Sequence, residues 1–369
     1  MTSISSLHAS SAMVILNASR AQTSQPPASA SGVILDSIIG GDPSTKKAQA
    51  SLLGILTGVL VNGSKGDDNI WANTGTAIKT GKGNDHVEAN SGNIIKTGAG
   101  DDSVHVNAGN TVFTGKGNDY VQANASNVIH TGGGDDLLLV NASNTIVTGS
   151  GDDKLFANAS NTIHTGGGDD QLTVNAANTI TTGAGNDKIF GNAENTIDAG
   201  DGDDIVSVNA GNMVAGGAGN DRINGGGNNV IDGGDGDDRI FTGSGQALGG
   251  AGNDIVTVFG SGGVIAGGTG DDQLTIGSGG LIRYDAGDGK DIVHGGSNST
   301  LAFGEGISAD DLRIEVSGNT TTISFAGSDT DSITLDTSAA STLTLAFADG
   351  NMQSLGGQAA NVTNAYQQS

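Results

Sequence analysis

The sequence predicts an all-β fold: a parallel β-roll, or β-solenoid, of about 14 turns built from 17-residue repeats. The five-residue core G-x-G-[ND]-D recurs at a constant spacing, and an aliphatic residue stands two positions after each final Asp. Of the 369 residues, 64 are Gly and only 3% are aromatic. This composition cannot build the thick core of a conventional globule of the same length.

The repeat runs from about residue 64 to about residue 291. The intact core begins at Gly81, Gly98, Gly115, Gly132, Gly149, Gly166, Gly183, Gly200, Gly217 and Gly234, with degenerate or shifted copies at Ser64, Gly250, Gly268 and Gly287. Each half of the repeat contains a short segment of β-branched and aliphatic residues bounded by Gly or Asn, which is typical of a strand. At about 4.8 Å per stacked strand, fourteen turns would form a rod roughly 65 Å long.

Two columns of aliphatic residues are expected to face each other inside the roll. One column follows the acidic turns (Ile70, Val87, Val104, Val121, Leu138, Leu155, Leu172, Ile189, Val206, Ile223, Ile240, Val256, Leu274, Val293) and the other lies in the second half of the repeat (Ile78, Ile95, Val112, Ile129, Ile146, Ile163, Ile180, Ile197, Val214, Ile231). So thin a core does not offset the conformational entropy lost in ordering many glycines. Another source of stability is therefore required.

Charge and composition restrict the partners. The net charge of −25 argues against nucleic acid or an anionic membrane and favours cations. The absence of Cys excludes disulfides and thiolate metal sites. The most apolar run, Leu52 to Val61, is too short for a transmembrane segment, and the N-terminus lacks the pattern of a Sec signal peptide. The chain is thus expected either to stay in the cytoplasm or to leave by a route that does not read the N-terminus.

The acidic turns resemble the calcium-binding nonapeptide G-G-x-G-x-D-x-U-x of RTX (haemolysin-type) β-rolls. The segments GGAGNDRIN (216–224), GGDGDDRIF (233–241), GGAGNDIVT (249–257) and GGTGDDQLT (267–275) match every fixed position, while upstream copies usually carry Thr for the first Gly. That change is expected to be tolerated if only the backbone of that position matters. The resemblance covers roughly residues 64 to 350.

The resemblance implies Ca²⁺ ions between neighbouring loops along one edge, held by glycine carbonyls and by the last Asp of each loop. Fourteen loops leave at most about 13 such gaps. The ligands implied are Asp68, Gly81, Gly83, Asp85, Gly98, Gly100, Asp102, Gly115, Gly117, Asp119, Gly132, Gly134, Asp136, Gly149, Gly151, Asp153, Gly166, Gly168, Asp170, Gly183, Gly185, Asp187, Gly200, Gly202, Asp204, Gly217, Gly219, Asp221, Gly234, Gly236, Asp238, Gly250, Gly252, Asp254, Gly268, Gly270, Asp272 and Asp291.

Physical chemistry supports this assignment separately. Ca²⁺ takes six to eight oxygen ligands in flexible geometry, and glycines let carbonyls converge. The final and penultimate Asp residues of the loops supply 22 of the 40 acids, and stacked on one edge they repel one another without counterions. The chain is therefore expected to be disordered or loosely collapsed without Ca²⁺ and to fold on binding it. Plain Gly/Asp turns explain one such loop but not fourteen in register, and the paired acids would repel a phosphate.

The intervening turns read N-A-x-N and form the other edge, as at Asn107/Asn110, Asn124/Asn127, Asn141/Asn144, Asn158/Asn161, Asn175/Asn178, Asn192/Asn195 and Asn209/Asn212. The second Asn occupies the position of the acid in the nonapeptide. Asn can stack as a hydrogen-bonded ladder but brings no charge to match an ion. This edge is predicted to be structural and free of calcium. The outward histidines (His86, His105, His130, His164, His294) are expected to be solvated, without metal-ligand grouping.

Three regions are predicted: residues 1–63 as an N-terminal segment with a short helical cap, 64–297 as the calcium-binding roll, and 298–369 as a C-terminal β segment. Leu52 to Val61 is the expected cap. The alternating segment Leu301 to Leu335 resembles the segment that closes RTX arrays, and the polar tail occupies the place where that family carries an uncleaved type I secretion signal. The resemblance implies secretion from a Gram-negative cell by the type I machinery.

These features predict a secreted, non-enzymatic calcium-binding protein that acts as a structural, adhesive or matrix component or at a host surface. An extracellular polysaccharide or a cell surface is the candidate partner. The alternative is a secreted enzyme acting on polysaccharide, similar to a lyase or epimerase. Against it, the sequence holds no H-E-x-x-H and no G-x-S-x-G with plausible partners, and Lys plus Arg total only 15.

Overall fold

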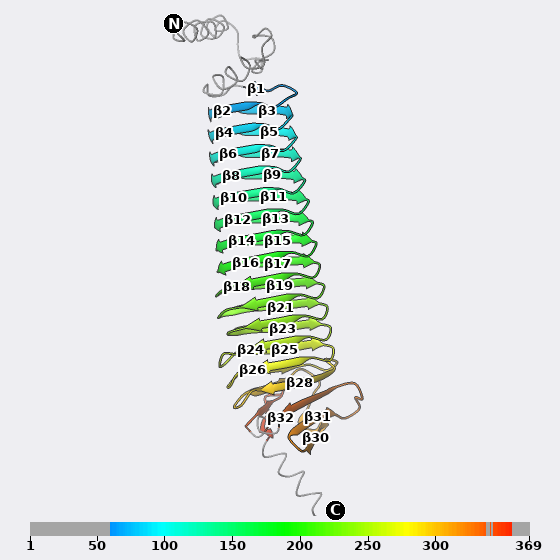
Figure 1. Ribbon diagram of the computed structural model, residues 1–369. Coiled ribbons are helices and arrows are strands. Elements are labelled where there is room, and N and C mark those ends of the chain that lie inside the picture. Colours follow the sequence, from blue (N-terminus) through cyan, green and yellow to red (C-terminus); the bar gives the residue numbers. More distant parts are fainter. Residues whose placement is uncertain (1–59, 337–339, 341, 356–369) are drawn as a thin grey trace, which may run out of the picture.

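The fold is a parallel β-solenoid, as the repeat predicts. The structure is a computed structural model and describes residues 60–336, 340 and 342–355. In Figure 1 the strands stack turn upon turn into a rod, with β30 and β31 at the end near the C-terminus. The predicted N-terminal cap at Leu52 to Val61 lies almost wholly outside the described residues, as does the polar C-terminal tail.

Two sheets run the length of the rod, one from each half of the repeat. Sheet A contains β1 (Leu60–Asn62), β3 (Ala77–Lys82), β5 (Ile94–Ala99), β7 (Thr111–Lys116), β9 (Val128–Gly133), β11 (Thr145–Ser150), β13 (Thr162–Gly167), β15 (Thr179–Ala184), β17 (Thr196–Asp201), β19 (Met213–Ala218), β21 (Asn229–Asp235), β23 (Gly245–Ala251), β25 (Val264–Thr269), β27 (Leu281–Tyr284), β29 (Thr300–Phe303), β33 (Thr344–Ala346) and β34 (Met352–Ser354). Sheet B contains β2 (Asn69–Thr74), β4 (His86–Ser91), β6 (Ser103–Ala108), β8 (Tyr120–Ala125), β10 (Leu137–Ala142), β12 (Lys154–Ala159), β14 (Gln171–Ala176), β16 (Lys188–Ala193), β18 (Ile205–Val208), β20 (Arg222–Gly225), β22 (Arg239–Thr242), β24 (Ile255–Val258), β26 (Gln273–Ile276), β28 (Lys290–Gly295), β32 (Ser332–Asp336), β31 (Thr320–Phe325) and β30 (Leu312–Ser317).

From β1 to β29 each strand pairs in parallel with its equivalent one turn away, so every position of the repeat forms a column along the rod. Gly81 pairs with Gly98 in sheet A, and Val87 pairs with Val104 in sheet B. The 17-residue register holds as far as β21, where Asn229 pairs with Gly245. Some of the turns beyond β21 are one residue shorter than 17 residues, or one or two residues longer. The strands of these turns still pair with their equivalents in the neighbouring turn.

The interior contains the two predicted aliphatic columns, both almost fully buried. Additional buried columns flank them: Ala or Val in sheet B (Ala72, Ala89, Val106, Ala123, Val140) and Thr in sheet A (Thr80, Thr97, Thr114, Thr131, Thr148). Each Thr hydroxyl donates to the carbonyl of the equivalent Thr one turn on, as from Thr97 Oγ1 to Thr114 O at 3.0 Å. The Thr side chain at the first position of the upstream loops therefore takes part in the packing, and more than its backbone matters.

The C-terminal segment closes the rod with a different kind of core. β30 and β31 form an antiparallel hairpin, β32 returns to pair with β28, and β33 pairs with β29. A 3-10 turn (Ala309–Asp311) precedes the hairpin. Tyr284 stacks on Phe325 with ring centroids 5.2 Å apart, and Phe303 stacks on Phe347 at 5.3 Å. Buried aromatic rings thus join the buried aliphatic side chains at this end of the rod. In the part of the chain that the structure describes, no helix is long and apolar enough to cross a membrane.

Candidate calcium-binding edge

The acidic loops line one edge of the rod, where the chain passes from sheet A to sheet B. The last Asp of each loop points inward and is buried, with 1–2% of its surface exposed from Asp85 to Asp272. One carboxylate oxygen accepts the backbone N–H of the equivalent Asp in the preceding turn, as from Asp136 N to Asp153 Oδ1 at 2.8 Å. This contact repeats along the column and fixes the carboxylates in register.

The second oxygen of these carboxylates has no hydrogen-bond partner among the described residues. Twelve such Oδ2 atoms are buried and unsatisfied: those of Asp85, Asp102, Asp119, Asp136, Asp153, Asp170, Asp187, Asp204, Asp221, Asp238, Asp254 and Asp272. A buried carboxylate oxygen without a donor strongly destabilises a fold, and native structures rarely tolerate one. Its regular repetition gives twelve equivalent positions at which a cation would satisfy the free oxygen.

The glycines place backbone carbonyls against this column. All twenty-four loop glycines from Gly81 to Gly270 that the resemblance implies as ligands have φ between +103° and +137°, a region that favours glycine. A Cβ at Gly151 would collide with the carbonyl oxygen of Gly134, and the same relation recurs turn after turn. The carbonyls therefore point from one loop into the next. Oxygen donors from two successive loops and a buried carboxylate fit the ligand preference of Ca²⁺.

The electrostatics of this column are unfavourable without a cation. Burial, together with repulsion from the neighbouring aspartates, raises the pKa of Asp119 to about 6 and the pKa of Asp136 and Asp170 to about 7. The pKa is raised for all twelve aspartates with an unsatisfied oxygen. A divalent ion beside each carboxylate would reverse this penalty and favour the charged form.

The two ends of the column differ from its middle. Asp68, in the loop where Ser replaces the first Gly, accepts the backbone N–H of Ser64 at 2.7 Å. Asp291 closes the column and accepts the N–H of Asp272 at 3.2 Å, and burial raises its pKa to about 8. Both are brought into the column as the sequence predicts. Their second oxygens are not among the unsatisfied atoms, so the donor set is most regular from Asp85 to Asp272.

The penultimate residues of the loops form a second, exposed ladder that the sequence did not reveal. Its hydrogen bonds run in the opposite sense: Asp152 N donates to Asp135 Oδ1 of the preceding turn at 2.9 Å. Asn and Asp alternate in this column without changing the contact, since Asp135 N donates to Asn118 Oδ1 at 2.9 Å. Only an oxygen acceptor is needed here, which explains why either residue occurs.

The opposite edge satisfies its own polar groups. Asn144 Oδ1 accepts from the backbone N–H and from Nδ2 of Asn127 at 2.9 and 3.0 Å. Its Nδ2 donates to Asn161 Oδ1 at 3.0 Å and to Asn124 O at 3.1 Å. These contacts recur in the column Asn93, Asn110, Asn127, Asn144, Asn161, Asn178, Asn195 and Asn212. The predicted hydrogen-bonded Asn ladder is therefore confirmed.

The comparison with protein families agrees with this geometry. A family model described as RTX calcium-binding nonapeptide repeat (4 copies) matches residues 77–104, 93–121, 106–138, 140–172, 159–178, 173–195, 193–212 and 216–246. The array is an RTX repeat array. Such repeats bind calcium and are typically structural rather than catalytic. No curated protein matches the chain.

One expectation about the RTX array's surface is wrong. His86 and His105 were expected to be solvated without metal-ligand grouping, but their ring nitrogens and a carboxylate oxygen of Glu88 all lie within 4.8 Å of one another. The register causes this, because Glu88 pairs with His105 across β4 and β6 and His86 lies two residues before Glu88 on the same face. We call these three residues the histidine cluster.

Proposed function

We propose that this chain is a secreted protein whose β-roll folds as Ca²⁺ fills the gaps between successive acidic loops. The observation that carries the proposal is the column of twelve buried carboxylate oxygens without a donor. In one gap, the ligands would be the carbonyls of Gly132 and Gly134 and the carboxylate of Asp136, facing Gly149 and Gly151 of the next loop. Up to about 13 ions would then lie in a single row along this edge.

Folding and ion stoichiometry test this proposal together. Far-UV circular dichroism of the full chain should show little β structure in EGTA and a strong β signal in millimolar Ca²⁺. Elemental analysis of the desalted, folded protein should give one row of ions and not two. The same β content in EGTA and in Ca²⁺ would contradict calcium-dependent folding. An ion count near twice the number of loops would contradict a single row of ions along one edge.

Export is the second part of the proposal. RTX repeats are typical of proteins secreted by the type I route. Cytosolic Ca²⁺ is scarce, so the chain would stay unfolded inside the cell and fold outside it. Expression in a Gram-negative host with a type I exporter should place the chain in the medium, and deletion of 298–369 should retain it. Retention of the full chain with the exporter present would contradict this route.

A groove along sheet B favours a polysaccharide as the extracellular partner. Three adjoining hollows form a groove from Trp71 to Phe241: Gln122 lines the first and second hollows, and Thr173 lines the second and third. One wall carries exposed Phe156 and Phe190 among other outward side chains. Aromatic faces pack against the apolar faces of sugar rings. Among the described residues, Glu88 is the only acid that lines the groove.

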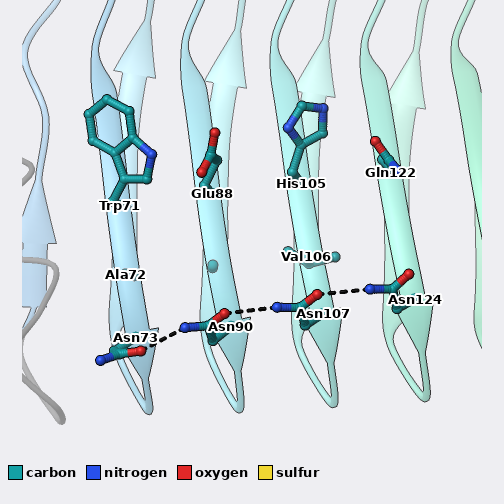
Figure 2. A pocket seen from close by; sticks show the side chains of 11 residues that line it. Trp71, Ala72, Asn73, Glu88, Asn90, His105, Val106, Asn107, Gln122 and Asn124 are labelled. Carbon is teal, nitrogen blue, oxygen red and sulfur yellow. Dashed lines mark hydrogen bonds between the residues drawn. The ribbon is translucent and has the colours of Figure 1, made fainter.

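The other wall is a ladder of exposed asparagines. Each Nδ2 donates to the Oδ1 of the preceding turn, as from Asn107 to Asn90 at 2.8 Å and from Asn124 to Asn107 at 2.8 Å (Figure 2). An amide has two N–H donors and an oxygen with two lone pairs, so one donor and one acceptor per turn stay available to hydroxyl groups. This pattern suits a neutral glycan chain, because the net charge of −25 repels a polyanion.

Glycan binding is tested with matched aromatic variants. A pull-down against the producer's envelope and exopolysaccharide, with Ca²⁺ and with EGTA, should capture the glycan only with Ca²⁺. Phe156→Ala should weaken binding, whereas Phe113→Ala, an exposed aromatic on sheet A, should not. Equal binding by both variants would exclude the groove, and release of unsaturated uronate from alginate or pectin would favour the alternative of a polysaccharide-degrading enzyme.

A further inference from the structure

We propose that the histidine cluster on the outer face of sheet B, formed by His86, Glu88 and His105, is a second metal site that binds one divalent transition ion such as Zn²⁺ or Cu²⁺. The inference uses no residue of the acidic edge and needs only that the roll is folded.

The geometry of the cluster supports three-point ligation. His86 Nε2 and Glu88 Oε1 are already 3.2 Å apart, and His105 completes a set whose ligand atoms all lie within 4.8 Å of one another. Ligands around a tetrahedral ion with bonds of about 2.0–2.1 Å are roughly 3.4 Å apart. The side chains of His86 and Glu88 are 31% and 47% exposed, so small rotations can close the remaining distance.

Aromatic neighbours hold the two imidazoles between them. Trp71 packs edge-on against His86 with ring centroids 6.4 Å apart, and Tyr120 packs edge-on against His105 at 5.5 Å. The two imidazoles are 5.2 Å apart and nearly perpendicular, at 83°. This packing restricts both rings before an ion arrives, which lowers the entropy lost on binding.

The ligand chemistry selects the class of ion. Two imidazole nitrogens with one carboxylate suit Zn²⁺, Cu²⁺ or Ni²⁺, whereas Ca²⁺ prefers oxygen ligands throughout. In Figure 2, Glu88 and His105 stand side by side on neighbouring strands between Trp71 and Gln122. Both also line the open hollow at the start of the groove, so the remaining coordination positions would be accessible to water or another small ligand.

The cluster depends on the fold because it spans two turns of the roll. Glu88 and His105 become neighbours only when β4 pairs with β6. In an extended chain, the residues between these positions would keep the ligands far apart. Tight binding therefore requires the folded roll.

The chain contains a single tryptophan, Trp71, and its ring lies beside His86. Its fluorescence therefore reports on this site. Cu²⁺ added to the full chain in saturating Ca²⁺ should quench the emission and saturate at one equivalent, and Zn²⁺ should compete and restore it. His105→Ala and Glu88→Gln should each weaken the Cu²⁺ affinity by at least about 10-fold. His130→Ala is the matched control: this imidazole stacks on Phe113 in sheet A, outside the cluster, and its loss should leave the titration unchanged.

Circular dichroism in Ca²⁺ verifies that each variant keeps the fold. Quenching with the parental affinity in both His105→Ala and Glu88→Gln would overturn the proposal. So would a titration that needs several equivalents and weakens equally in His130→Ala, because that result indicates binding to scattered histidines. Loss of the one-equivalent phase in the cluster variants alone would support the site, whether or not the acidic edge binds calcium as proposed.

Discussion

Acid should partly replace calcium in holding the roll together. In the calcium-free fold, burial raises the pKa of Asp85 and Asp221 from 3.8 to about 6 and the pKa of Asp204 to about 7. The unfolded chain keeps the ordinary value, so between about pH 4 and pH 7 the folded chain binds more protons than the unfolded one. The free energy of unfolding of the calcium-free protein therefore falls as the pH rises through this window and recovers as the pH is lowered.

The magnitude per aspartate is large. A pKa raised from 3.8 to about 6 destabilises the calcium-free fold by about 3 kcal/mol at pH 7 and by about 1.5 kcal/mol at pH 5. Native domains are stable by only about 5–15 kcal/mol, so three or four such residues suffice to unfold the roll at neutral pH. In nine of the twelve aspartates of the column the pKa is raised to about 6 or 7.

Circular dichroism of the calcium-depleted chain between pH 7.5 and pH 5 measures this effect. We expect a β signal that is absent at pH 7.5 and grows as the pH falls below about 6–7. The lower limit keeps the chain above its isoelectric point of about 4.1, and sedimentation velocity would show that the signal comes from monomers. An equal β content at pH 7.5 and at pH 5 would refute the reasoning that ionised, buried carboxylates destabilise the calcium-free fold.

Three further predictions concern the calcium-loaded protein, all measured by urea unfolding in saturating Ca²⁺. Gly168→Ala should destabilise by more than about 2 kcal/mol, because φ is +121° and the Cβ would meet a carbonyl of the preceding turn. The control is Gly109→Ala. Gly109 has φ of +65° and no atom near the added Cβ, so this variant should lower the free energy of unfolding by only about 1 kcal/mol. Ala177→Gly should stabilise by up to about 1 kcal/mol, because Ala177 has φ of 54° at the turn of the Asn edge, and destabilisation would contradict this. Asn161→Asp should destabilise by about 3 kcal/mol through the loss of two buried donors, whereas Asn158→Asp on the exposed ladder should change stability by less than about 1 kcal/mol. Similar losses for the two Asn variants would contradict the burial argument.

The sequence predicts the columns of this fold well because a fixed repeat length makes every position a column. Ile78 and Val87 are buried where periodicity placed them, and Asn144 lies in the ladder that its spacing indicated. What periodicity does not contain is the direction of a side-chain hydrogen bond. The exposed Asp135 accepts from the following turn, whereas the buried Asp136 accepts from the preceding turn, although both are aspartates in the same loop.

The histidine cluster was missed for a different reason. His86 and His105 are 19 residues apart, so they do not share a column and no simple periodicity joins them. Glu88 links them, because it pairs with His105 one turn away and shares a face with His86. Comparing neighbouring columns as well as single columns would have found the group. The sequence shows that the repeat length changes after β21, because the copies of the acidic loop are shifted there. How the strands still pair depends on backbone packing, which the sequence pattern does not contain.

The Asp edge and the Asn edge of the rod differ by one side-chain atom per turn. Asp153 and Asn161 make the same first contact, an oxygen that accepts the backbone N–H of the preceding turn. In Asn161 the remaining atom is a nitrogen, and it donates to two oxygens nearby. In Asp153 the remaining atom is a buried oxygen without a hydrogen-bond donor, and a cation or a proton would satisfy it. In the folded roll the Asn edge therefore satisfies its own polar groups, while the Asp edge leaves an oxygen that a cation or a proton from the medium would satisfy. An array with acidic loops on both edges would need calcium twice per turn, whereas the single row proposed for this chain would need it once.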